Sequence, residues 1–220
     1  NGDSGQYFLN LGMIRQAALD AGVPFLNIVQ ACSWTPSMRI PTGEELRWLV
    51  YTSLAYGAQG LSYYVYSHPN HNGAMATLEG QPTDLYRAAR TLNREFESIA
   101  AALQPLRSLG AYHAGMVPPG ADPLPEAVPF RLDPPLTAVD YEPSKPVQGF
   151  VLGCFGPPAR QGDVSGPTHV LLVNLDYKQE KTTTLVGPTP WESFDPATGK
   201  WAAAGGKRVE LHLAPGGGKL

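Results

Sequence analysis

Cysteine is scarce in this chain of 220 residues, since Cys32 and Cys154 are its only two. They lie far apart, in segments of different composition, and this placement predicts no structural disulfide. The count also excludes a zinc site of the CxxC type, which needs paired thiolates at short spacing. Cys32 is therefore interpreted as a small, buried apolar residue.

The sequence also lacks long apolar runs and blocks of like charge. No run approaches the ~18 apolar residues of a transmembrane helix. The formal net charge is −3 and is evenly spread, which argues against a nucleic acid or an anionic membrane surface as partner. No charged start followed by an apolar core precedes the first helical pattern, so no signal peptide is identified. The sequence does not assign the protein to a cellular compartment, and export from the cell is one of the alternatives.

Proline and glycine, by contrast, are abundant. The chain has 22 prolines and 24 glycines, and the prolines concentrate between residues 118 and 167. From this change in composition we predict three parts. They are a first domain at residues 1–115, a Pro-rich linker at residues 116–146 and a second domain at residues 147–220.

The chain is organised around residues 24–68, PFLNIVQACSWTPSMRIPTGEELRWLVYTSLAYGAQGLSYYVYSH. Residues 25–32 form a nearly unbroken apolar run, which predicts a strand buried on both faces, as in a parallel sheet. Thr42 and Glu45 make a capping box that begins a helix, and residues 61–67 form a second strand. Strand, helix and strand predict a right-handed crossover unit, whose ligand site lies at the carboxyl ends of the strands.

Helical patterns flank this unit on both sides. Asp3 or Ser4 caps a first helix that ends at Gly22, and a long helix covers residues 84–103. Short β-type runs follow, at residues 109–113, 149–155, 169–175, 182–186, 191–194, 200–201 and 208–213. Short strands at this spacing predict a small antiparallel sandwich in the second domain.

Several phrases carry a resemblance to a known family. PFLNIVQ, GEELRWLVYTSLAYGAQG and LSYYVYSH are similar to the seventh strand, the following helix and the eighth strand of clan A glycosidases, most closely the family 42 β-galactosidases. FDPATGKW and LAPGGGKL resemble the hairpin and final turn of the β-domain in such enzymes. The resemblance implies an α/β plus all-β protein: a partial (β/α)8 barrel made of the last two βα units, then a small antiparallel β-sandwich.

This resemblance is incomplete in two respects. A whole barrel takes ~250 residues, whereas about 115 precede the predicted linker. We therefore expect a missing N-terminal barrel half, or a homo-oligomer, to cover the open sheet edge. Family 42 enzymes carry a nucleophilic glutamate where this chain has Val29, followed by Gln30, and neither side chain can attack an anomeric carbon. The general acid of the clan follows the fourth strand, so both catalytic residues stay unassigned here.

Four residues are candidates to line a sugar site: Gln30, Trp34, Tyr66 and His68. Tyr66 matches a tryptophan that floors the sugar site in the family, and Trp34 offers a second flat face to pyranose C–H groups. The alternatives are core packing for Tyr66 and covering the barrel top for Trp34. Gln30 either binds sugar hydroxyls or is a satisfied polar residue of the barrel. His68 and His71 lack a third ligand nearby, so neither a metal nor another cofactor is expected.

The resemblance implies hydrolysis of a glycosidic bond by the complete protein, through two carboxylates that flank the bond. This chain would be a fragment of that glycoside hydrolase-like protein, not competent alone, with a carbohydrate as ligand. The alternative is a non-catalytic carbohydrate-binding or structural module, which Val29 and the incomplete barrel favour.

Overall fold

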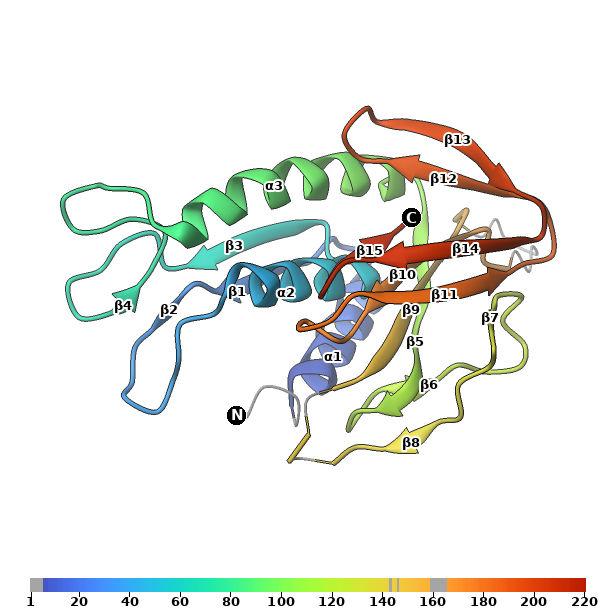
Figure 1. Ribbon diagram of the computed structural model, residues 1–220, viewed down its shortest axis with the longest axis horizontal. Coiled ribbons are helices and arrows are strands. Elements are labelled where there is room, and N and C mark those ends of the chain that lie inside the picture. Colours follow the sequence, from blue (N-terminus) through green and yellow to red (C-terminus); the bar gives the residue numbers. More distant parts are fainter. Residues whose placement is uncertain (1–5, 143, 146, 159–165) are drawn as a thin grey trace.

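The computed structural model describes residues 6–142, 144–145, 147–158 and 166–220 (Figure 1). Across these residues the protein is mixed α/β, with more strands than helices, and none of the described sheets is closed. No helix in this part of the chain combines the length and hydropathy needed to span a membrane. The predicted caps Asp3 and Ser4 lie outside the described residues.

The helices begin and end close to where the sequence predicts. They are α1 (Tyr7–Ala21), α2 (Gly43–Ala55) and α3 (Asp84–Leu103). The capping box of α2 is confirmed: the Thr42 hydroxyl accepts the backbone N–H of Glu45 at 3.3 Å, and the Glu45 carboxylate accepts the backbone N–H of Thr42 at 2.9 Å. Thr83 caps α3 through its hydroxyl, and α1 ends at Gly22, whose φ of 65° is left-handed.

Most predicted strands are present, with modest shifts in their bounds. Two strands are clearly longer than predicted: β5 runs past both ends of residues 109–113, and β13 continues beyond residues 200–201. The strands are β1 (Leu26–Gln30), β2 (Cys32–Ser33), β3 (Gly60–Tyr64), β4 (Asn72–Gly73), β5 (Arg107–Val117), β6 (Asp122–Pro123), β7 (Arg131–Asp133), β8 (Val139–Asp140), β9 (Gly149–Gly156), β10 (His169–Asn174), β11 (Lys181–Val186), β12 (Trp191–Asp195), β13 (Lys200–Gly205), β14 (Arg208–Leu213) and β15 (Gly218–Lys219).

The first two long strands are parallel, as predicted for a crossover unit. β1 pairs with β3 from Leu26 opposite Gly60 to Gln30 opposite Tyr64, and α2 connects them. The predicted burial on both faces is wrong. Val29 is 1% exposed on the face that packs on the helices, whereas Ile28 is 64% exposed on the other. Only one face is covered within the described residues, because the three helices and the larger sheet all lie on that side.

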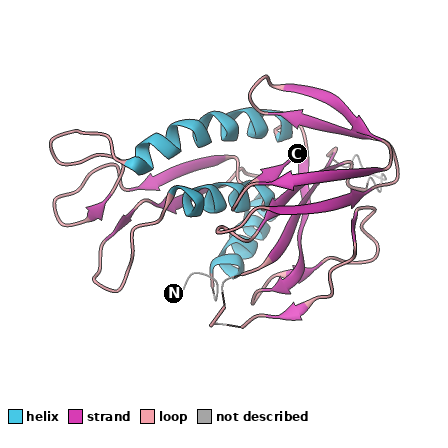
Figure 2. Cartoon of the chain, viewed as in Figure 1, coloured by secondary structure: helices cyan, strands magenta, loops and turns pink. Residues whose placement is uncertain are grey.

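Residues of the larger sheet enter buried clusters on both of its faces. Figure 2 distinguishes the strands from the helices. The strands of the larger sheet run in the order β15-β10-β9-β5-β6, with β8 beside β5. Alternate residues of β9 and β10 enter two different buried clusters. Val151, Phe155, Leu171 and Val173 pack with the helices, while Phe150, Leu152, Val170 and Leu172 pack with residues of β7, β11 and β14.

The segment predicted as a linker, residues 116–146, contributes to these sheets. β7 pairs antiparallel with β11. Phe130 and Leu132 are buried in the cluster that lies between the larger sheet and the strands β7, β11 and β14. The helices are likewise tied to the strands, because the Trp48 indole N–H donates to the Leu175 carbonyl at 3.1 Å. The two halves of the described chain therefore share one buried core.

His113 on β5 is a fully buried titratable residue that contacts this core through Phe8. Its ring lies 4.7 Å from that of Phe8, and its Nε2 atom lies 2.9 Å from the Tyr56 hydroxyl. Burial lowers the pKa of His113 to about 3, because the charged imidazolium would lose its hydration. The ring is therefore neutral at ordinary pH.

Candidate functional site

The carboxyl ends of β1 and β3 are joined into one structure by the loops that follow them. After β1 the chain forms β2, which pairs antiparallel with β4 from the loop after β3. The Ala31 N–H donates to the Tyr64 carbonyl at 2.7 Å, and the Ala74 N–H donates to the Ala31 carbonyl at 2.8 Å. Both loops extend beyond the helices in Figure 1. These backbone bonds fix their positions relative to the strand ends.

Four aromatic side chains meet in these loops: Trp34, Tyr64, His68 and His71, here called the aromatic cluster. The Trp34 and Tyr64 rings are 5.3 Å apart and nearly perpendicular. The Tyr64 hydroxyl lies 3.0 Å from His71 Nε2, and the rings of His68 and His71 are 4.0 Å apart. The cluster joins two predicted site residues, Trp34 and His68, through two that the prediction did not include.

Gln30 positions the loop that carries Trp34. Its side-chain amide donates to the Cys32 and Arg39 carbonyls, both at 2.9 Å. Because both amide hydrogens are used, only the amide oxygen of Gln30 is left to contact a ligand. This supports the polar structural alternative for Gln30 over recognition of a sugar by both ends of the amide.

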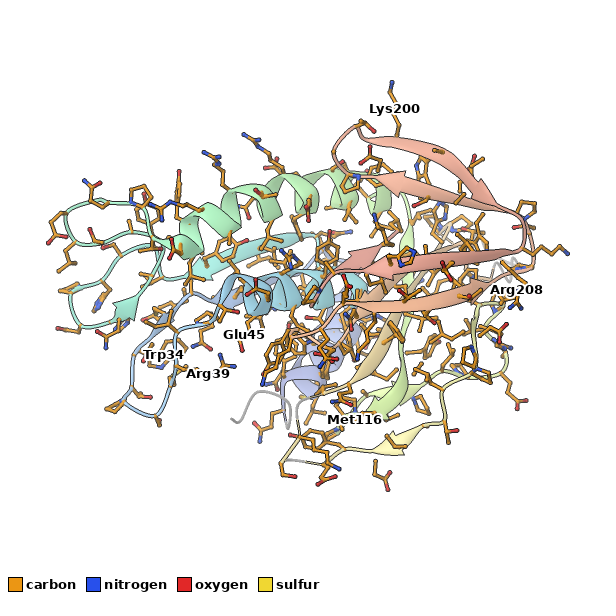
Figure 3. The ribbon with its side chains drawn as sticks, viewed as in Figure 1. Trp34, Arg39, Glu45, Met116, Lys200 and Arg208 are labelled. Carbon is orange, nitrogen blue, oxygen red and sulfur yellow. The ribbon has the colours of Figure 1, made fainter. Side chains whose placement is uncertain are left out.

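Arg39 and Glu45 fasten the same loop to the start of α2. They form an ion pair, and the Glu45 carboxylate also accepts the backbone N–H of Thr42. Figure 3 shows Trp34, Arg39 and Glu45 on one side of the molecule, near the start of α2. Glu45 is 10% exposed at its side chain and is committed to this arrangement. It is therefore unsuited to act as a catalytic carboxylate.

Tyr66 points away from the packed core. It is 61% exposed, and its backbone carbonyl accepts the Ala76 N–H at 2.7 Å. The core-packing role falls instead to Tyr63, whose hydroxyl donates to Asn93 at 2.6 Å and whose pKa is raised to about 12 by burial. No ring contact between Tyr66 and the aromatic cluster occurs within the described part of the chain.

The alternation of side chains along β1 explains the place of Val29. Successive residues of a strand point to opposite faces, so Leu26, Ile28 and Gln30 share the uncovered face. Val29 points to the helices and is packed in the core. A carboxylate at position 29 would be buried there, and Gln30 is the residue of this pair that faces outward.

The carboxylates near the strand ends have structural partners or low pKa values. Four lie between β1 and the start of α3: Glu44, Glu45, Glu79 and Asp84. The backbone N–H of Glu44 itself and the Thr42 hydroxyl lower the pKa of Glu44, and the Thr77 hydroxyl lowers that of Glu79. Asp84 pairs with Arg87. A general acid needs a raised pKa, which neither Glu44 nor Glu79 has.

Metal ligation is not supported by the described side chains, where no three His, Cys, Asp or Glu residues converge.

No known family model matches this chain, and no curated protein is significantly similar to it. Tyr64 was not among the four predicted site residues, although the predicted strand at residues 61–67 puts Tyr64 and Tyr66 two positions apart and so on one face.

Proposed function

We propose that this chain supplies one side of a carbohydrate-binding site in a glycosidase-like protein similar to the family 42 β-galactosidases. In this interpretation residues 1–115 are the last two βα units of a (β/α)8 barrel, residues 116–146 are the connection, and residues 147–220 are an antiparallel β-sandwich. Further strands, from an N-terminal barrel half or from a second copy of the chain, would cover Leu26 and Ile28, which are 60% and 64% exposed.

The observation that carries the proposal is the aromatic cluster at the carboxyl ends of a parallel strand pair. Ligands of parallel α/β proteins bind at this end of the strands. Trp34 and Tyr64 are each 43% exposed, so they offer flat apolar surface to the C–H groups of a pyranose ring. His68 and the hydroxyl of Tyr66 supply polar atoms for the sugar hydroxyls.

Catalysis, in the complete protein, would come from two carboxylates that flank the glycosidic bond. We assign neither to this chain, because Val29 faces the core and the nearby carboxylates have structural roles. The same observations favour the second candidate, a non-catalytic sugar-binding module. A carboxylate pair at the strand ends of the full gene product, ~5 Å apart for retention or ~6.5–9.5 Å for inversion, would distinguish the two.

Fluorine NMR of the chain labelled with fluorotryptophan tests the binding site. The four tryptophans give four resonances, each assigned by its Trp→Phe variant, and lactose, cellobiose and maltose are the probes. We expect the Trp34 resonance to shift saturably with at least one disaccharide, while that of buried Trp48 stays still. A Trp34 resonance that none of the three sugars moves would contradict the proposal.

A further inference from the structure

We propose that the strand-rich part of the chain holds a second sugar-binding site, in a groove between the β12–β13 hairpin and the strands β10, β11 and β14. The groove encloses about 490 Å³. Binding sites for small molecules usually enclose ~300–1,000 Å³. This site shares no residue with the aromatic cluster, and it does not depend on the function proposed above.

The groove lies well apart from the ends of β1 and β3. Its walls include Trp191 and Trp201, from the two strands of the hairpin. Lys200, the neighbour of Trp201, is on the opposite side of the molecule from Trp34 and Arg39 (Figure 3). A ligand in the groove would therefore not touch the aromatic cluster.

Trp191 is held in a fixed position. Its indole N–H donates to the Lys207 carbonyl at 3.1 Å, and its ring lies 5.4 Å from that of Phe130. Gly187 makes room for it, because a Cβ atom at that position would come within 2.4 Å of the indole. A rigid aromatic surface binds a ligand with little further loss of side-chain entropy.

Trp201 forms a second aromatic surface and is partly open to solvent. Its ring lies 5.1 Å from that of Phe194 and 5.4 Å from that of His169, and the residue is 39% exposed. These two neighbours support the indole while leaving part of it accessible. Two indoles in one groove suit the C–H faces of pyranose rings.

Polar groups stand beside the indoles. His169 Nδ1 and the Thr168 hydroxyl are hydrogen-bonded at 2.9 Å. The Nε2 atom of the ring is therefore the one that can contact a ligand. Burial lowers the pKa of His169, which keeps the imidazole neutral and able to exchange hydrogen bonds with hydroxyl groups. Glu192 and Lys219 also line the groove, and the Glu192 carboxylate interacts electrostatically with His169.

This combination fits a pyranoside better than other ligand classes. A sugar needs flat apolar surface for its C–H groups together with neutral and charged hydrogen-bonding partners for its hydroxyls. A purely apolar ligand would offer no hydrogen-bonding partner to the His169 imidazole. A proline-rich peptide is the competing occupant, because it also binds aromatic-lined grooves.

The fluorotryptophan-labelled chain separates the two sites in one titration. With lactose, cellobiose or maltose we expect saturable shifts of the Trp201 and Trp191 resonances, with a dissociation constant on the order of 1 mM. Trp201→Ala should weaken this binding at least about tenfold, as loss of a central aromatic contact does. Trp34→Ala is the matched control and should leave binding in the groove unchanged. The resonances of Trp34 and Trp201 report the two proposed sites separately, so either can fail alone.

Three results would overturn the proposal. One is that none of the three sugars moves either groove resonance. Another is that the Trp201→Ala variant, shown to be folded by a cooperative thermal melt, binds the sugars as tightly as the parent chain. The last is that a proline-rich peptide shifts both resonances while the sugars do not. If Trp201→Ala does not fold, Glu192→Gln takes its place, and unchanged sugar affinity in that variant counts against the site.

Discussion

The strands β1 and β9 share an apolar character but have very different surroundings. Both are rich in apolar residues without regular alternation, and both were predicted as strands. β9 is buried from Phe150 to Gly156 because helices cover one face of its sheet and β7, β11 and β14 cover the other. β1 exposes Leu26 and Ile28 because only its helix-facing side is covered within the described residues. A continuous apolar run thus indicates which side chains of a strand can be buried. The elements packed on each face decide how many of them are.

The largest contrast should come from equal truncations in the two regions. Leu171 on β10 is fully buried, so Leu171→Ala should lower the free energy of unfolding by about 2–5 kcal/mol. Ile28→Ala should change it by less than about 0.5 kcal/mol, because the side chain is already exposed. Urea unfolding of both variants measures the difference. A large loss of unfolding free energy in Ile28→Ala would contradict this contrast, because it would mean that this face of β1 is covered in solution.

Buried His113, in the covered region, should make the stability of the chain depend on pH. The unfolded chain binds a proton at His113 below pH 6.5, whereas the folded chain does not until its pKa of about 3. Stability should therefore fall as pH drops below 6.5, by about 1.4 kcal/mol per pH unit from this residue. His113→Gln should remove that part of the slope in urea unfolding between these pH values. His68→Gln, in the exposed loop, serves as the control, and equal slopes in both variants would contradict the assignment.

The start of α2 couples the buried region to the loops. Thr42→Ala removes one half of the capping box and should cost about 1 kcal/mol of stability. Thr42→Ser keeps the hydroxyl and should restore most of it. Thermal unfolding of the two variants checks the expectation. Equal stability of the alanine and serine variants would show that the cap contributes nothing measurable.

The smallest effect on stability is expected at Tyr66, in the exposed region. Because the side chain is 61% exposed, Tyr66→Ala should change the free energy of unfolding by less than about 0.5 kcal/mol. The variant should still weaken binding of sugar to the aromatic cluster, read from the Trp34 fluorine resonance. Tyr66→Phe isolates the hydroxyl. If Tyr66→Ala binds the sugar as the parent chain does, Tyr66 lies outside the site.

Several features of the fold were predictable because they depend on neighbours in sequence. The capping box joins Thr42 to Glu45, three residues apart, and its two hydrogen bonds are present. Gly22 ends α1 because a left-handed residue there satisfies the last carbonyls of the helix. The parallel pairing of β1 and β3 follows from a single helix between two strands.

Other features could not be predicted, because they depend on residues far apart in sequence. Phe130 lies in a Pro-rich segment without periodicity, yet it is buried beside Trp191. The contact between Trp34 and Tyr64 requires the loop after β1 to reach the end of β3. The groove of Trp191 and Trp201 exists only because a hairpin and three other strands come together.

Local sequence is enough to specify the helices, most of the strands and the caps of α2 and α3, because local hydrogen bonds and periodic burial act over a few residues. It also placed Gln30, Trp34, Tyr66 and His68 at or beyond the strand ends. Only the tertiary structure decided that Val29 faces the core, that Gln30 holds a loop and that one face of β1 is left open. Those outcomes depend on which elements pack on which face, and burial is a property of the assembled chain rather than of any segment.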